Sequence, residues 1–250
     1  MQPEISQKLL DINYQFYQTF AAAFSRTRAR VQPGVRRALG LIPLHGNWLD
    51  IGCGNGTVAR AWAADGRTGR YQGLDFSAGL LEEARTLQGS VPEGLQIEFA
   101  EANLSEPGWT RAVQDGDWDG ALAFAVLHHL PGMELRQRVL ADLASLLQPG
   151  ALFILSNWQF ANSDRWLARV QPWSLAGIDE HTLEPGDTLL DWRASLPGQP
   201  EQVGLRYVHL FTRAELNNLA ESAGFEVQDA YESDGSNGRL GLYQVWRKVA

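Results

Sequence analysis

The chain has 250 residues, of which 44% are hydrophobic, and this is enough for one sizeable core. Its 21 basic and 29 acidic residues give a net charge of −8, and an acidic chain is not an obvious nucleic-acid binder. The single cysteine, Cys53, excludes an internal disulfide, and no apolar run is long enough to span a bilayer. The N-terminus has no signal-peptide pattern, so we expect a cytoplasmic protein.

The first predicted element is a helix over residues 5–24, because apolar side chains form a broad stripe along it. This helix can pack on the core, or it can be a lid whose Tyr14 or Tyr17 closes over a ligand. The following segment, 24–37, contains no acidic residue, and its five arginines are Arg26, Arg28, Arg30, Arg36 and Arg37. It is either a solvated face or a site for a carboxylate or phosphate, which the planar arginine fork binds bidentately. We expect residues 1–45 to form a helical lid with this arginine-rich segment.

The sequence WLDIGCGNG, residues 48–56, is the centre of the predicted organisation. A buried strand ends at Ile51, a helix follows the turn, and the alternating glycines are Gly52, Gly54 and Gly56. A strand, glycine turn and helix present backbone N–H groups to a ligand at the carboxyl end of a sheet. The spacing GxGxG lacks the usual pyrophosphate site of dinucleotide binders. Because Asp50 adds a carboxylate, the turn suits a ligand with a cationic end, such as S-adenosylmethionine.

Two further strands carry polar residues at their ends. Tyr71–Leu74 predicts a strand ending at Asp75, about 20 residues past the glycine turn, where an acid accepts hydrogen bonds from ribose hydroxyls. The alternative role for Asp75 is an interaction with the dipole of the helix that Ser77 begins. Phe76 could lie along an adenine ring. Asn103 follows a strand over 95–99 and is either an adenine contact or a turn residue.

A fourth strand is predicted at Trp118–Phe124 and a fifth at Ala151–Leu155, with a helix between them that ends before the sequence LQPG. His128 and His129 follow the fourth strand at the functional edge of the sheet. Adjacent histidines more often supply one packed and one surface residue than two catalytic ones. No Cys, Asp or Glu stands at ligand spacing around them, so we expect no metal.

Residues 159–205 interrupt the alternation with prolines and tryptophans and predict an irregular insertion that covers the ligand cleft. A helix then begins at Thr212 with a T-x-x-E capping box. Glu226–Tyr231 and Leu240–Arg247 predict an antiparallel hairpin at the sheet edge. Seven strands with helices between them predict an α/β doubly wound sheet, and we expect residues 46–250 to form this domain together with the insertion.

The segments LDIGCGNG, LDFS, FAVLHHLP, LQPGALF and AGFEV together resemble class I S-adenosylmethionine-dependent methyltransferases. The resemblance implies a Rossmann-like sheet of seven strands with helices on both faces and the last strand antiparallel. It also implies S-adenosylmethionine as cofactor and S-adenosylhomocysteine as product. The cofactor-binding residues that it implies are Tyr17, Asp50, Gly52, Cys53, Gly54, Asn55, Gly56, Asp75, Phe76, Ser77, Asn103, Leu104, Phe124 and Ala125.

A narrower resemblance involves AAAFSRTRARVQPGV, GDTLLDW and GLRYVHLFTRAEL, which look like segments of the tRNA wobble-uridine carboxyl methyltransferases. Those enzymes methylate the carboxylate of 5-carboxymethyluridine. The resemblance implies four catalytic positions, at Arg28, His129, Arg206 and His209. Here RYVH replaces the family's RYYH, so one tyrosine contact is missing. Eukaryotic members act with a small zinc-containing activating subunit, which makes such a subunit a candidate partner.

Three functions stay open on the sequence. A carboxylate acceptor needs cations rather than a base, and Arg28 and Arg206 could position it. An amine or hydroxyl acceptor would need a base, for which His129 is the candidate. The chain is therefore expected to methylate a tRNA carboxylate, or to be a small-molecule O- or N-methyltransferase, or to bind the cofactor without catalysis. The corresponding partners are tRNA or a small-molecule acceptor, with no membrane.

Overall fold

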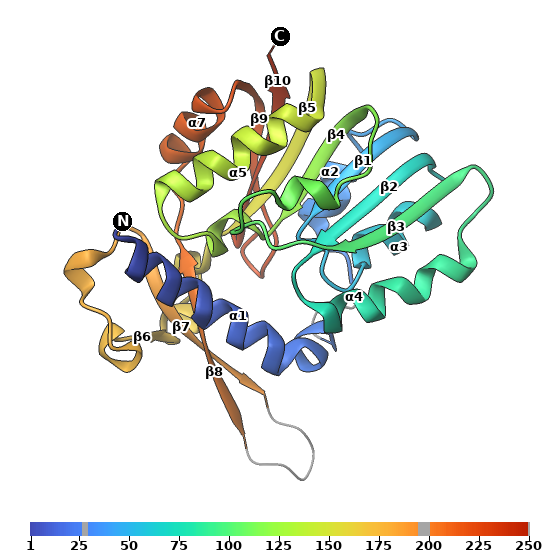
Figure 1. The fold of residues 1–250 in the computed structure, drawn as a ribbon. Helices are drawn as coiled ribbons and strands as arrows, with labels where there is room; N and C mark the ends of the chain where they lie inside the picture. The colour runs from blue at the N-terminus through green and yellow to red at the C-terminus, as the bar shows by residue number, and fades with distance from the viewer. Residues whose placement is uncertain (27–29, 195–200, 250) are drawn as a thin grey trace.

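The computed structural model describes residues 1–26, 30–194 and 201–249. Seven strands form one central sheet in the order β3-β2-β1-β4-β5-β10-β9 (Figure 1). Their bounds are β1 His45–Ile51, β2 Thr68–Asp75, β3 Leu95–Glu101, β4 Trp118–Phe124, β5 Leu147–Trp158, β9 Phe225–Ser233 and β10 Gly241–Lys248. Strand β10 runs antiparallel to both of its neighbours, while β1 to β5 pair in parallel. This confirms the predicted α/β sheet with an antiparallel last strand.

Helices cover both faces of the central sheet. Side chains alternate between the two faces along each strand, so one strand contributes to a hydrophobic core on either side. Leu49 and Ile51 of β1 join a core with α5 and α7, whereas Trp48 joins a core with α2, α3 and α4 on the other face. The bounds of these helices are α2 Pro33–Leu39, α3 Thr57–Ala64, α4 Ala78–Arg85, α5 Met133–Leu146 and α7 Arg213–Ser222. Helix α7 begins at the predicted N-cap, where the Thr212 hydroxyl accepts a hydrogen bond from the Glu215 N–H at 3.1 Å.

The insertion over 159–205 is more regular than the sequence predicts. After the short helix α6, Asp164–Leu167, the chain forms a three-stranded antiparallel sheet from β6 Val170–Gln171, β7 Asp187–Ala194 and β8 Gln202–His209. Both faces of this insertion sheet are covered. Leu190 and Val208 pack with Phe160, while Tyr207 packs with Leu9 on the other side. A strand buried on both faces does not show the polar–apolar alternation by which strands are predicted.

Helix α1, Pro3–Arg26, lies across the insertion sheet and reaches α4 (Figure 1). Phe16 and Phe20 pack against Trp192 of β7, and Tyr17 packs edge-on against Phe76. The helix therefore both packs on the fold and borders the ends of the central strands. Among the described residues, no helix is long and apolar enough to cross a membrane.

Candidate active site

A cavity of about 1040 Å³ lies at the carboxyl ends of β1, β2 and β4. Its wall includes Asp50 and Gly54 from the glycine turn, Asp75 at the end of β2 and Phe124 at the end of β4. Helix α1 and the insertion sheet supply the opposite wall. In doubly wound sheets ligands bind at this edge, so the cavity lies where the strand order predicts a ligand.

Most of the residues predicted to bind the cofactor line this cavity. They are Tyr17, Asp50, Gly52, Cys53, Gly54, Asn55, Asp75, Phe76, Asn103, Leu104, Phe124 and Ala125. Two predicted residues, Gly56 and Ser77, are not among the lining residues. Gly56 caps α3, where an added Cβ would lie 2.9 Å from the Ala84 Cβ, and the Ser77 hydroxyl caps α4. These two residues shape the helices that border the cavity.

Asp75 joins the glycine turn to the end of β2. Its carboxylate accepts hydrogen bonds from the Gly54 N–H at 2.8 Å and from the Ser77 N–H at 2.9 Å. Gly54 has φ +56°, and a Cβ built on it would meet no atom within 4 Å. At this position a side chain would therefore extend into the cavity, which is why the turn needs glycine.

The backbone on the far side of the cavity is also unusual. Ala125, directly after β4, has φ +61°, a left-handed conformation that is uncommon for a residue with a Cβ. Its N–H donates to the Ser156 carbonyl at 3.0 Å, which holds the chain in this conformation. Strained residues of this kind gather at ligand sites. Asn103, by contrast, accepts a hydrogen bond from the Ser105 N–H and so acts as a turn residue at the cavity edge.

Two buried carboxylates give the cofactor end its electrostatic character. Asp50 is 2% exposed and accepts a hydrogen bond from the Tyr71 hydroxyl. Burial, partly offset by the Tyr71 hydrogen bond and assisted by the charge of Asp75, raises the pKa of Asp50 to about 7. Burial also raises the pKa of Asp75. A buried carboxylate favours a cationic ligand group, so this part of the cavity fits the ammonium and ribose of S-adenosylmethionine.

Arginines from the insertion line the other end of the cavity. Arg206 of β8 is 3% exposed, and its guanidinium carbon lies 5.0 Å from the ring centroid of Phe16 and 5.2 Å from that of Trp158. The buried Asp191 carboxylate holds Arg193 at 2.9 Å and Arg169 at 3.4 Å. Both of these arginines also line the cavity. The insertion thus contributes these three arginines and one buried carboxylate to the cavity wall, and Arg26 and Arg30 line the cavity from the N-terminal segment.

His129 lies between these two ends. Its Nδ1 is 3.1 Å from the Tyr207 carbonyl oxygen, which can only accept, and 3.5 Å from the Asn13 amide nitrogen; we assign the proton to Nδ1 on the shorter contact. Its Nε2 is 3.0 Å from the Tyr17 hydroxyl. The neighbouring His128 is buried, and its Nδ1 faces the Trp158 N–H at 3.4 Å. Both histidines line the cavity, His128 as a buried residue and His129 as a half-buried one, so neither is the surface residue expected of an adjacent pair.

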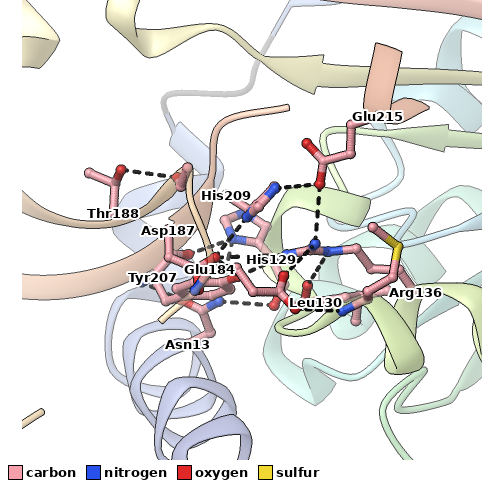
Figure 2. Close-up of polar contacts among 12 residues, drawn as sticks. Asn13, His129, Leu130, Arg136, Glu184, Asp187, Thr188, Tyr207, His209 and Glu215 are labelled. Atoms are coloured by element: carbon pink, nitrogen blue, oxygen red, sulfur yellow. Dashed lines mark hydrogen bonds and ion pairs between the residues drawn. The ribbon is translucent and has the colours of Figure 1, made fainter. Parts of the chain in front are cut away.

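Arg28 and His209 are the other two residues that the resemblance implies to be catalytic besides His129 and Arg206. Arg28 lies outside the described residues. His209 is not among the residues that line the cavity. It is 1% exposed and lies in an ionic cluster with Arg136, Asp187 and Glu215 (Figure 2). No local sequence pattern marks this cluster, because its members come from distant segments of the chain.

The cluster contains the one group of described residues whose spacing could hold a metal ion: Glu184, Asp187 and His209. The Arg136 guanidinium lies among them, with Nη1 3.0 Å from the Glu184 carboxylate and Nη2 3.8 Å from that of Asp187. Because a permanent cation already pairs with both carboxylates, the donor set is not suited to a metal ion.

Comparison with known proteins places the chain among the methyltransferases. Residues 23–230 match a family model described as a methyltransferase domain. The tRNA (carboxymethyluridine(34)-5-O)-methyltransferase of Schizosaccharomyces pombe is 28% identical over 233 residues, which cover 88% of this chain and 92% of that protein.

Solved structures show the same fold. A methyltransferase of Methanosarcina mazei, described as S-adenosylmethionine-dependent, is 24% identical, with a TM-score of 0.61 over 88% of this chain and 99% of the other. The 1,6-didemethyltoxoflavin-N1-methyltransferase of Burkholderia thailandensis, solved with 1,6-didemethyltoxoflavin and S-adenosylhomocysteine, is 19% identical. Its TM-score is 0.62, over 100% of this chain and 92% of the other. Because the family model matches most of its length, this chain belongs to the methyltransferase-domain family.

Proposed function

We propose that this methyltransferase, which uses S-adenosylmethionine as its methyl donor, methylates the carboxylate of a 5-carboxymethyl group on a tRNA wobble uridine. The observation that carries the proposal is Arg206, a buried guanidinium on the wall of the cavity, at the end opposite Asp50 and Asp75. The name of the Schizosaccharomyces pombe relative, which covers most of this chain, supports the same acceptor.

S-adenosylmethionine, when bound, supplies a methyl group that its sulfonium has already activated. The chain then has to align the acceptor and exclude water. A carboxylate is ionised at neutral pH and needs no base, but it does need a cation to hold it. Arg206 provides that cation, and the rings of Phe16 and Trp158 beside its guanidinium fix the plane in which it offers its N–H groups.

The hydrogen bonds of His129 also favour an acceptor that needs no base. Nδ1 carries the proton that the Tyr207 carbonyl accepts, which leaves Nε2 as the only acceptor nitrogen of the neutral ring. The Tyr17 hydroxyl lies 3.0 Å from that nitrogen and can donate to it. An amine or hydroxyl acceptor would therefore have to displace the Tyr17 hydroxyl to reach this nitrogen.

A negatively charged chain can still bind RNA if its basic residues are concentrated at the binding surface. Arg165, Arg169 and Arg193 lie with Arg206 along the insertion side of the cavity, so the surface that would meet a phosphate backbone is basic although the net charge is −8. The predicted helical lid over 1–45, the activating subunit and a cytoplasmic location are further parts of this proposal.

A second candidate is a small-molecule O- or N-methyltransferase. The cavity volume of about 1040 Å³ exceeds what a single cofactor needs, so it could enclose a small acceptor as well. The Burkholderia thailandensis protein shows that this fold accepts a small heteroaromatic substrate.

Methyl transfer from labelled S-adenosylmethionine into cell extract separates these candidates. We expect the label in the RNA fraction, and we expect mild alkali to release it, because a methyl ester hydrolyses and a methylated base does not. Label confined to small molecules would support the second candidate instead. Absence of label from every fraction would contradict both and favour a binding protein without catalysis.

A further inference from the structure

An ionic cluster joins the insertion sheet to the central domain (Figure 2). Its members are Arg136 from α5, Glu184 from the loop before β7, Asp187 from β7, Tyr207 and His209 from β8, and Glu215 from α7. None of these six residues lines the cavity, so they act on the site only through other residues.

The hydrogen bonds of His209 fix its protonation state. Its Nδ1 lies 2.7 Å from the Asp187 Oδ1, and its Nε2 lies 2.8 Å from the Glu215 Oε1. Carboxylate oxygens only accept hydrogen bonds, so both ring nitrogens must donate. A neutral imidazole has one N–H and would turn a lone pair toward one of the two carboxylates. The geometry therefore requires an imidazolium.

The charges around His209 lead to the same conclusion. Three carboxylates, those of Glu184, Asp187 and Glu215, face a single guanidinium, that of the fully buried Arg136. The Tyr207 hydroxyl donates to Asp187 at 2.8 Å and accepts from Arg136 at 3.1 Å. Burial lowers the pKa of His209, but the hydrogen bonds to Asp187 and Glu215 outweigh this and leave the pKa above its ordinary 6.5. A proton on His209 therefore offsets one of the two excess negative charges of the cluster.

This cluster determines where Arg206 lies. Side chains alternate along β8, so Arg206 faces the cavity while Tyr207 and His209 face the cluster. His209 is the register partner of Asp187, so its bond to Asp187 closes the end of the β7–β8 ladder. Its bond to Glu215 joins that same end to α7 of the central domain.

We infer that His209 is a positioning residue for methyl transfer: as an imidazolium it bridges Asp187 of the insertion sheet and Glu215 of α7, and so holds Arg206 opposite the cofactor end. The effect on the acceptor rests on the proposed function, since Arg206 is there assigned to the acceptor carboxylate. The protonation state and the bridge itself do not depend on that assignment.

The bridge makes the insertion sheet sensitive to alkaline pH. Because the pKa of His209 is raised in the folded chain, its stabilising contribution is complete below about 6.5 and is lost as pH rises through the raised pKa. We expect the acceptor KM to rise over that alkaline range while the affinity for S-adenosylmethionine stays constant. A histidine that acted as a base would give the opposite trend, with activity falling as pH drops.

The experiment compares His209→Gln with His181→Gln, an exposed histidine of the same insertion. At pH 7 we expect His209→Gln to raise the acceptor KM roughly tenfold or more, through misplacement of Arg206, with unchanged cofactor affinity. The His181→Gln variant should behave as wild type. Glu215→Gln keeps the backbone N–H that Thr212 caps but removes one charge, so it should move the alkaline midpoint to lower pH.

Nitrogen-15 NMR of the wild-type imidazoles tests the protonation state without any acceptor. We expect the two ring nitrogens of His209 to have similar, imidazolium-like shifts at pH 7. Widely split shifts would overturn the inference, as would an unchanged acceptor KM in a folded His209→Gln variant or an unmoved alkaline midpoint in Glu215→Gln. If the RNA accepts no methyl group, the proposed function fails, whereas the NMR result still decides whether His209 is an imidazolium.

Discussion

Replacing Arg206 with alanine is expected to reduce the single-turnover rate of methyl transfer roughly 100-fold, because an acceptor carboxylate without its cation is no longer aligned with the methyl group. Cofactor affinity should change little, since Arg206 lies at the end of the cavity opposite Asp50 and Asp75. Lysine at this position should restore little activity. An ammonium group cannot reproduce the planar fork, and it cannot stack between Phe16 and Trp158 in the same way.

The matched control is Arg239→Ala, because the Arg239 side chain is 60% exposed and pairs with Glu232 at the surface. This variant should keep the wild-type rate. Full activity of a folded Arg206→Ala variant would rule out the carboxylate acceptor. If His129→Ala were instead the damaging change, with a rate that falls as pH drops through about 6.5, the acceptor would be a neutral group.

The Gly54→Val variant is expected to lose cofactor binding by about 100-fold or more while it keeps its fold. The branched side chain would extend into the cavity from a residue with φ +56°, so steric overlap with the ligand and backbone strain act together. Circular dichroism and calorimetric titration on one sample measure both properties.

Gly177→Val separates these two causes. Gly177 has φ +61° and, like Gly54, has no atom within 4 Å of a built Cβ, but it lies in the insertion and does not line the cavity. This control carries a similar backbone strain, so it should lose stability without losing cofactor affinity. Wild-type affinity in Gly54→Val would show that the glycine turn has only a structural role.

The central sheet could be predicted from the sequence because its signals are local. The strand at Trp118–Phe124 has the predicted bounds, and the run of apolar residues alone identifies it. The first strand begins earlier than expected, at His45, because Gly46 and Asn47 pair with β2 although neither is apolar. The fifth strand likewise includes the LQPG segment, which was expected only to end the preceding helix.

The part of the cavity wall formed by the glycine turn and Asp75 was also predictable, because glycine spacing and an acid after the next strand are short-range signals. The part formed by the insertion was not. Arg169 and Arg193 are brought together by Asp191 on a strand whose two faces are both buried, so no alternating pattern marks it. Family resemblance, rather than any local pattern, pointed to Arg206.

Glu215 makes one contact that the sequence predicts and two distant contacts that it does not. The sequence T-x-x-E predicts a capping box, and the Thr212 hydroxyl does cap the Glu215 N–H. The Glu215 side chain, however, contacts His209 at 2.8 Å and Arg136 at 3.5 Å. No spacing rule links these residues, because the fold alone brings α5, α7 and β8 to one place.

The most direct test of a carboxylate acceptor uses an RNA hairpin with a single 5-carboxymethyluridine in its loop, beside the same hairpin in which a carboxamide replaces the carboxylate. Each is incubated with this protein and methyl-labelled S-adenosylmethionine, and incorporated label is counted before and after mild alkali. We predict label in the carboxylate hairpin alone, released by alkali as methanol. Equal labelling of the carboxamide hairpin, or alkali-stable label in either RNA, would contradict the account.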